Sequence, residues 1–325
     1  MSIIRLKTVF LDDDQLDGAI HTTNIKTNDL INIESEKMQK CVRCNVTVAP
    51  AITTSCIVNV NNLNGELTSY EDYEQAMTEI TNEIGIKEYW TTRVDMKFDS
   101  YDEEHYVKYA KLYRLLISMI AVTYNVKNCY RSVDLFTEQQ LSVAIKNSEF
   151  EIENYDKNRE SGGKNPAKSR LELRSKRMKG RSIRQEFLVM WRNRWKNAIK
   201  NFDLVGERYN DKLVEIYYRD LEAFPKKFAD VTDFLLQYQN CIFTKEQMID
   251  LLEQIGVKNP KIKYQNHKQR YGIELFNKED VRVAIDKINE ATEKYFYKSK
   301  MIKSENDDGL NVRGQSEKND DLKVA

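Results

Sequence analysis

Apolar and polar residues alternate along much of the first 180 residues, a pattern typical of strands with one buried face. The clearest run covers 92–99, where Val94, Met96 and Phe98 alternate with four charged residues. Successive side chains of a strand point to opposite faces, so this run predicts one apolar and one charged face. By the same pattern, further strands are predicted at 5–11, 40–50, 53–60, 142–157 and 169–178.

Two stretches between these strands have helical spacing instead. Residues 69–85 place Ala76, Ile80 and Ile84 four apart and end in a glycine, and residues 102–124 form a longer amphipathic pattern. Strands that return in hairpins, with helices between them, predict an α+β fold. We expect a mostly antiparallel sheet with helices on one face.

The chain after residue 180 is predicted to be helical, with Trp191 and Trp195 at helical spacing among basic residues. Segment 244–298 predicts a helix–hairpin–helix unit resembling a winged helix. Its first helix starts at the N-cap Thr244, and alternating residues at 262–275 predict the two strands of the hairpin. We therefore expect four regions: an α+β catalytic domain (1–180), a basic helical region (181–240), a DNA-recognition unit (241–300) and a disordered tail (301–325).

Charge is balanced overall but uneven along the chain. Lysine plus arginine and aspartate plus glutamate both total 51 in 325 residues. Between Lys164 and Lys200, however, 13 basic residues face only Glu172 and Glu186, an excess of +11. Such a local excess indicates a surface for a polyanion, and a solvated helix face is the alternative.

The sequence favours a cytoplasmic location without a membrane segment. The start of the chain lacks the apolar core and cleavage site of a secretory signal, and no apolar run reaches the ~20 residues of a membrane helix. Five cysteines form no even framework, which fits a reducing compartment. Cys41 and Cys44 make a C-x-x-C with no second pair, so we interpret them as structural.

The polar positions of three predicted strands, 92–99 and the two strands within 149–178, combine carboxylates, basic groups and a tyrosine. These positions are Arg93, Asp95, Lys97, Asp99, Glu151, Glu153, Tyr155, Lys157, Arg170, Glu172 and Arg174. Neighbouring strands lie ~4.8 Å apart, so carboxylates from two or three of them can converge on one hard cation. The alternative is an ordinary solvated face stabilised by cross-strand ion pairs.

Other chemistries lack their motifs. The three histidines, His21, His105 and His267, form no H-x-H or HExxH pair, and no nucleotide-binding glycine motif or G-x-S-x-G is present. The glycines at 162–163 lie in a polar loop, 158–167, that joins two of the strands and is expected to be mobile beside the DNA.

The order RVDMKFD, a helix, AIKNSEFEIENYDK and then RLELR, together with the turn NVNNLNG, resembles the replication initiation factor family. This family comprises rolling-circle initiators of Gram-positive plasmids and related relaxases of integrative elements. The resemblance covers roughly residues 40–180. It implies a plasmid- or prophage-encoded protein that binds origin DNA, nicks one strand with a tyrosine and works with host helicase and polymerase, with a homodimer as one option.

Position by position, the resemblance implies Tyr155 as nucleophile and Asp95, Glu172 and Asp99 as ligands of Mg²⁺ or Mn²⁺. Other tyrosines compete for the nucleophile's role: Tyr89, Tyr101, Tyr106, Tyr124 and Tyr130. The expected DNA contacts are Arg93, Lys157, Arg170, Arg174, Lys176, Arg177, Arg181, Arg184, Arg192, Arg194, Lys268 and Arg270. The alternative is a non-catalytic, origin-specific DNA-binding protein on the same fold.

Overall fold

A computed structural model describes residues 16–48, 52–65, 67–101, 106–126, 143–167 and 169–310. Its centre is a seven-stranded sheet in the order β2-β3-β1-β4-β7-β6-β5, with every neighbouring pair antiparallel. The strands are β1 (Asp17–Thr27), β2 (Val42–Thr47), β3 (Thr53–Asn59), β4 (Trp90–Ser100), β5 (Val143–Lys146), β6 (Phe150–Tyr155) and β7 (Ser169–Lys176). The predicted α+β class is confirmed.

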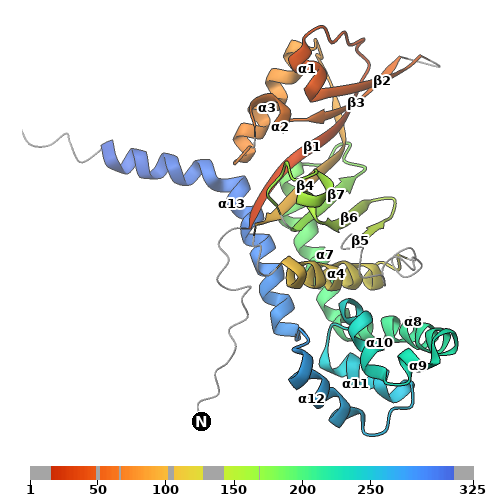
Figure 1. The fold of residues 1–325 in the computed structure, drawn as a ribbon. Coiled ribbons are helices and arrows are strands. Elements are labelled where there is room, and N and C mark those ends of the chain that lie inside the picture. Colours follow the sequence, from red (N-terminus) through yellow and green to blue (C-terminus); the bar gives the residue numbers. More distant parts are fainter. Residues whose placement is uncertain are drawn as a thin grey trace, which may run out of the picture.

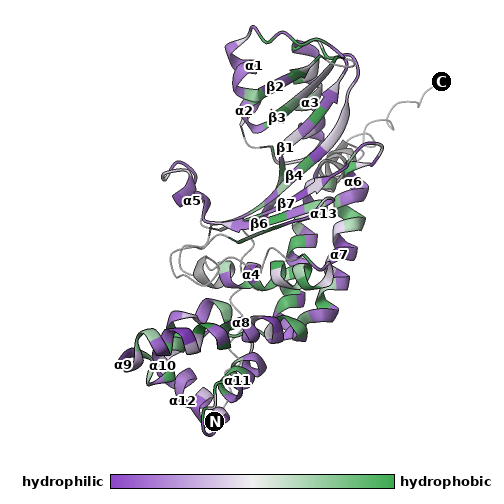
Figure 2. Ribbon diagram, turned by 90° about the vertical axis from the view of Figure 1, so that its right-hand side faces the viewer, coloured by the Kyte–Doolittle hydropathy of each residue, from purple (hydrophilic) through white to green (hydrophobic). Residues whose placement is uncertain are grey.

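Most of the helices lie on one side of the sheet or beyond its lower end (Figure 1). Those of the first half are α1 (Glu36–Cys41), α2 (Asn61–Asn64), α3 (Tyr70–Glu83), α4 (Tyr106–Thr123) and α5 (Lys157–Glu160). Those of the second half are α6 (Ile183–Gln185), η4 (Glu186–Trp191), α7 (Arg192–Ala198), η5 (Ile199–Asn201), α8 (Phe202–Ala223), α9 (Pro225–Phe228), α10 (Val231–Gln237), η6 (Gln239–Cys241), α11 (Lys245–Gln254), α12 (Pro260–Tyr271) and α13 (Lys278–Leu310). Hydrophobic colouring concentrates where α4, α7 and α13 meet the sheet (Figure 2).

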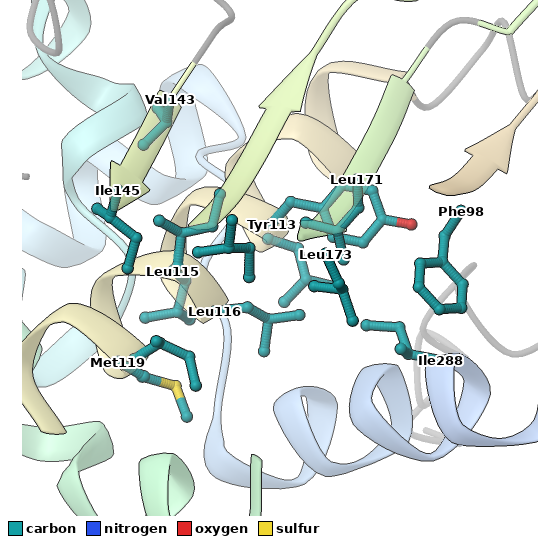
Figure 3. Packing of buried hydrophobic residues seen from close by; sticks show 14 of the residues in the cluster. Phe98, Tyr113, Leu115, Leu116, Met119, Val143, Ile145, Leu171, Leu173 and Ile288 are labelled. Carbon is teal, nitrogen blue, oxygen red and sulfur yellow. The ribbon is translucent and has the colours of Figure 1, made fainter. Parts of the chain in front are cut away.

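The core forms where α4 and α13 cover the apolar side of the sheet. Leu116 of α4 lies beneath Leu173 of β7, and Ile288 of α13 lies near Phe98 of β4 (Figure 3). All four side chains are buried, and each such burial contributes roughly 1.5–3 kcal/mol. This packing turns the apolar side chains of β4, β6 and β7 toward the helices. The alternating polar side chains therefore lie on the opposite side of the sheet.

Helix α3 shows why the local signals were reliable. The Ser69 side chain accepts a hydrogen bond from the Asp72 backbone N–H at 3.1 Å, which caps the helix start. Gly85 follows the helix with φ +75°, a conformation that glycine adopts without strain. The prediction of a helix at 69–85 is confirmed.

Several elements differ from the prediction, or were predicted for residues that the structure does not describe. The central strand β1 was not predicted, and the predicted strand at 5–11 lies outside the described residues. The expected hairpin at 262–275 is wrong, because this stretch forms α12 and an extended exit segment. The tail predicted at 301–325 is helical as far as Leu310, and its remainder lies outside the described residues.

The alternation of apolar and polar residues at 262–275 predicted strands, but this segment lacks a wide apolar stripe. Only two side chains of α12 are buried. Tyr264 and His267, three residues apart, are buried, whereas Ile262 and Tyr271 are exposed. Pro260 occupies the first helical turn, and Gly272, with φ +62°, ends the helix. Within the described ranges, no helix is both long and apolar enough to cross a membrane.

Candidate functional site

Strands β4, β7 and β6 direct their polar residues to the side of the sheet away from the core. The antiparallel register aligns three rows across these strands: Asp95, Arg174 and Glu151; Lys97, Glu172 and Glu153; and Asp99, Arg170 and Tyr155. Opposite charges alternate along β4 and β7 and across the row of Asp95, Arg174 and Glu151, which favours cross-strand pairs. Glu172 and Glu153, by contrast, are like charges directly opposite each other. We call these nine residues the polar face. The sequence predicted its membership, and the structure confirms that the three strands are neighbours.

Glu172 lies at the centre of the polar face. One of its oxygens, Oε1, accepts a hydrogen bond from the Tyr155 hydroxyl at 2.6 Å, and its other oxygen accepts from Arg174 Nη2 at 2.5 Å. Burial opposes the charge of Glu172, yet His21, Arg174 and the tyrosine hydroxyl together hold its pKa below the ordinary value. Glu172 is therefore ionised at neutral pH and accepts a hydrogen bond directly from the Tyr155 hydroxyl.

A buried ion pair occupies the next row. Arg170 donates through Nε and Nη2 to the two oxygens of Asp99 at 2.6 and 2.7 Å, and Lys97 Nζ lies 2.9 Å from the same carboxylate. All three residues are at most 5% exposed. Burial works against the charge of Asp99, but the two cations lower the pKa of its carboxyl group. Both oxygens of Asp99 are thus bound by buried cations of the protein itself.

Asp95, four residues before Asp99 in the middle of β4, is held in the same manner. Arg93 donates to both of its oxygens at 2.6 Å, and Arg174 Nε lies 3.9 Å away. Asp95 is 3% exposed, while the Arg93 side chain retains 31% exposure. Arg93 therefore neutralises a buried carboxylate and still reaches solvent.

The three predicted metal ligands do not form one donor set. Asp95 and Asp99 are four residues apart on one strand, which separates their Cα atoms by about 13 Å. Each carboxylate also contacts a guanidinium group within hydrogen-bond distance, as does Glu172. Within the described residues, no group of three or more His, Cys, Asp or Glu side chains is arranged to hold a metal ion. These three residues together do not fit the predicted cation.

Tyr155 belongs to the polar face, directly across from Arg170. Burial, followed by the charge of Glu172, raises the pKa of its hydroxyl well above the ordinary value. Of the competitors, Tyr89 and Tyr124 are exposed elsewhere, and Tyr101 follows the end of β4. The side chain of Tyr106 and all of Tyr130 lie outside the described residues. Tyr155 is held as a phenol, hydrogen-bonded to an ionised carboxylate.

His21 is a member of this site that the sequence reasoning did not identify. It lies at an irregularity of β1, between the pairs Ile20–Met96 and Thr22–Asp95, and its Nε2 is 3.5 Å from Glu172 Oε1. Burial lowers the pKa of His21, and the charge of Glu172 opposes this effect. A strand signal at 17–27 was the observation needed to find it, and the threonine-rich sequence there concealed that signal.

The basic window does not form one surface. Arg170 and Arg174 belong to the polar face, whereas Arg194 is buried against Glu186 at 2.7 Å and packs on the ring of Trp191. We therefore remove Arg194 from the expected DNA contacts, together with Arg170, which is equally buried and bound to Asp99. Other predicted contacts remain at least partly accessible: Arg93, Lys157, Arg174, Lys176, Arg177, Arg181, Arg184, Arg192, Lys268 and Arg270.

The loop at 158–167 contains a short helix and a hydrogen bond across its base. It begins inside α5, where Asp156 caps the helix by accepting from the Arg159 N–H at 2.9 Å. The Asn158 backbone N–H donates to the Ala167 carbonyl at 2.8 Å, which closes the loop at its base. The segment projects from the end of β6 and β7 (Figure 2). Its predicted cleavage by protease and protection by DNA remain predictions.

Comparisons with protein-family models, curated proteins and solved structures gave no match.

Proposed function

We propose that the chain is a rolling-circle-type replication initiator that binds DNA across the polar face and cleaves one strand with Tyr155. The observation that carries the proposal is the 2.6 Å hydrogen bond from the Tyr155 hydroxyl to the buried, ionised Glu172. It joins a nucleophile to a proton acceptor within the distance that general-base catalysis needs. The family resemblance of residues 40–180 supports the same reaction.

In the proposed reaction, the Tyr155 oxygen attacks a backbone phosphorus while its proton passes to Glu172. The bond between phosphorus and the 3′ oxygen breaks, and that oxygen takes up the proton as a 3′ hydroxyl. The 5′ phosphate remains attached to the tyrosine. One phosphodiester replaces another, so the step needs no external energy source.

Two arginines supply positive charge near the hydroxyl. Arg170 lies directly across from Tyr155 on β7, where its charge favours a developing phenolate. Arg174, partly exposed and two rows from Tyr155, bonds the other oxygen of Glu172 and the carboxylate of Glu151. Fixed cations of this kind stabilise charge that develops in the transition state.

Strand cleavage is tested on a supercoiled plasmid that carries this chain's own gene and flanking DNA. Wild-type protein should produce nicked circles and a covalent protein–DNA band on a denaturing gel. Tyr155→Phe should produce neither, whereas Tyr124→Phe, which changes an exposed tyrosine elsewhere, should retain both. Parallel reactions with Mg²⁺, Mn²⁺ or a chelator test the predicted cation, to which we assign no step because the expected ligands do not converge.

A non-catalytic DNA-binding protein is the second candidate, and one observation favours it. The carboxylates of the polar face are paired with cations, and the pKa of Tyr155 is raised rather than lowered. A face of this kind can act as a scaffold beneath a DNA groove. If Tyr155→Phe protein supports replication from the element's origin as well as wild type does, this second function is correct and the first is wrong.

A further inference from the structure

The helices α11 and α12 form a pair whose turn has the features of a helix-turn-helix. The caps Ile255 and Asn259 leave three residues between them, including Gly256 with φ +79°. The Val257 N–H donates to the Leu252 carbonyl at 2.9 Å, which closes the end of α11. Short glycine-containing turns of this length join the two helices of DNA-binding helix-turn-helix units.

Helix α11 is fixed from inside the helical region. Thr244 caps it by accepting from the Gln247 N–H at 3.0 Å, and the Gln247 side chain bonds the Cys241 carbonyl and the Phe243 N–H. Met248, Leu251 and Leu252 are buried. Helix α11 therefore serves as the supporting helix of the pair.

Helix α12 is held by a narrow stripe and exposes the rest of its surface. Only Tyr264 and His267 are buried, and Lys263 is tied to Asp230 at 2.7 Å. The exposed residues of α12 are Lys261, Ile262, Gln265, Asn266, Lys268, Gln269, Arg270 and Tyr271. We call the first seven of these the reading face. It contains no acidic residue, in a chain where acids and bases are equally common.

The composition of the reading face matches what base recognition requires. Glutamine and asparagine pair with adenine edges, and arginine and lysine pair with guanine edges or phosphates. From Lys261 to Gln269 the helix rises about 12 Å, which is the width of the major groove. Helix α12 lies at the end of the molecule opposite to β2 and β3 in both views (Figures 1 and 2).

We propose that α12 is a recognition helix that enters the major groove of double-stranded DNA and reads its sequence through the reading face. The inference rests on the proposed function only in taking DNA as the partner. It assigns duplex recognition to α12 and strand cleavage to the polar face, two separate sites of the chain.

Selection from a randomised pool of DNA duplexes with the full chain tests the proposal. Wild type should enrich one short motif and bind it at least tenfold more tightly than pool DNA. The pair Lys268→Ala and Arg270→Ala should weaken binding about tenfold or more and reduce the salt slope by about 0.9 for each lost phosphate contact. A matched control, Lys37→Ala with Lys40→Ala on α1, removes the same charge from exposed positions and should bind as wild type.

A second variant separates reading from attraction. Gln265→Ala with Gln269→Ala leaves the charge unchanged, so it should keep pool binding while reducing discrimination for the motif roughly tenfold for each lost base contact. Enrichment of no motif, or equal motif binding by the Lys268→Ala and Arg270→Ala protein and its control, overturns the proposal. Equal or tighter binding to an A-form RNA duplex also overturns it, because side chains do not enter the deep, narrow major groove of RNA. None of these measurements needs cleavage, so a failed cleavage assay and a failed duplex assay are distinct results.

Discussion

Replacing Glu172 by glutamine separates the chemical role of this residue from its structural one. Glutamine keeps the size of the side chain and an oxygen that accepts from Tyr155, but it cannot take up a proton at neutral pH. We expect the covalent adduct to form about a hundredfold more slowly or worse, which is the usual effect of losing a general base.

Stability should fall by less than is typical for a broken buried ion pair. Removing one partner from such a pair costs roughly 3–5 kcal/mol because the other charge is left alone. Arg174, however, retains Glu151 at 2.6 Å and Glu153 at 2.7 Å. We therefore expect Glu172→Gln to lower the free energy of unfolding by about 1–3 kcal/mol in urea denaturation.

Glu172→Gln should also change the pH dependence of stability. The folded pKa of Glu172 lies below the ordinary value, so the carboxylate contributes stability at pH values above the ordinary carboxyl pKa. This contribution is lost as pH falls through the lower folded pKa. Glu172→Gln lacks it, so the stability of the variant should decline less steeply on the acid side.

Glu153→Gln is the matched control, because Glu153 contacts the same Arg174 nitrogen but has no hydrogen bond to Tyr155 in the structure. Its side chain is 24% exposed, compared with 3% for Glu172, so we expect it to lose less than about 1 kcal/mol. Adduct formation should continue close to the wild-type rate. Equal loss of adduct in both variants would refute the role of Glu172 as proton acceptor, and unchanged stability of Glu172→Gln would refute its burial within the ion-pair network.

Three further changes test the packing independently of function. Gly18→Ala should destabilise the chain by about 1–3 kcal/mol in urea denaturation, because the added Cβ would meet a phenylalanine ring at 3.0 Å and a backbone oxygen of α13 at 3.3 Å; no loss would show that β1 and α13 are less closely packed. Arg194→Met should cost about 3 kcal/mol by leaving Glu186 buried without its arginine, and a second change, Glu186→Gln, should recover part of the loss in a double-mutant cycle. Cys44 and Cys56 are direct cross-strand partners of β2 and β3, so a thiol oxidant such as diamide should link them in a disulfide that a non-reduced peptide map detects, and two free thiols after full oxidation would contradict the register.

The sequence was most informative where its signals are local. A helical apolar stripe and a terminal glycine lie within one short segment, and together they predict α3. The Ser69 cap is a finding of the structure. The parity of β4, β6 and β7 was also readable, since a strand alternates its side chains whatever its neighbours are. The polar face therefore followed from the sequence in membership, including Glu172 and Tyr155.

Which polar residues meet was decided by tertiary structure. The central position of β1 depends on pairing with β3 and β4, which are distant in sequence, and its threonines gave no clear alternation. His21 consequently went unrecognised as a neighbour of Glu172. The separation of Asp95 from Asp99 along β4 likewise matters only once the register shows that each faces an arginine.

The same division between local and long-range effects explains α12. The sequence determined that segment 260–271 is basic and contains no acidic residue. Its apolar and aromatic residues are few, and their spacing fits a strand as well as a weakly amphipathic helix. Tertiary packing decided the outcome, because Tyr264 and His267 are buried on one stripe while the other polar side chains of the helix remain at least partly exposed. Local preference sets what a segment can become, and the long-range contacts that bury one of its faces determine which of those structures the folded chain adopts.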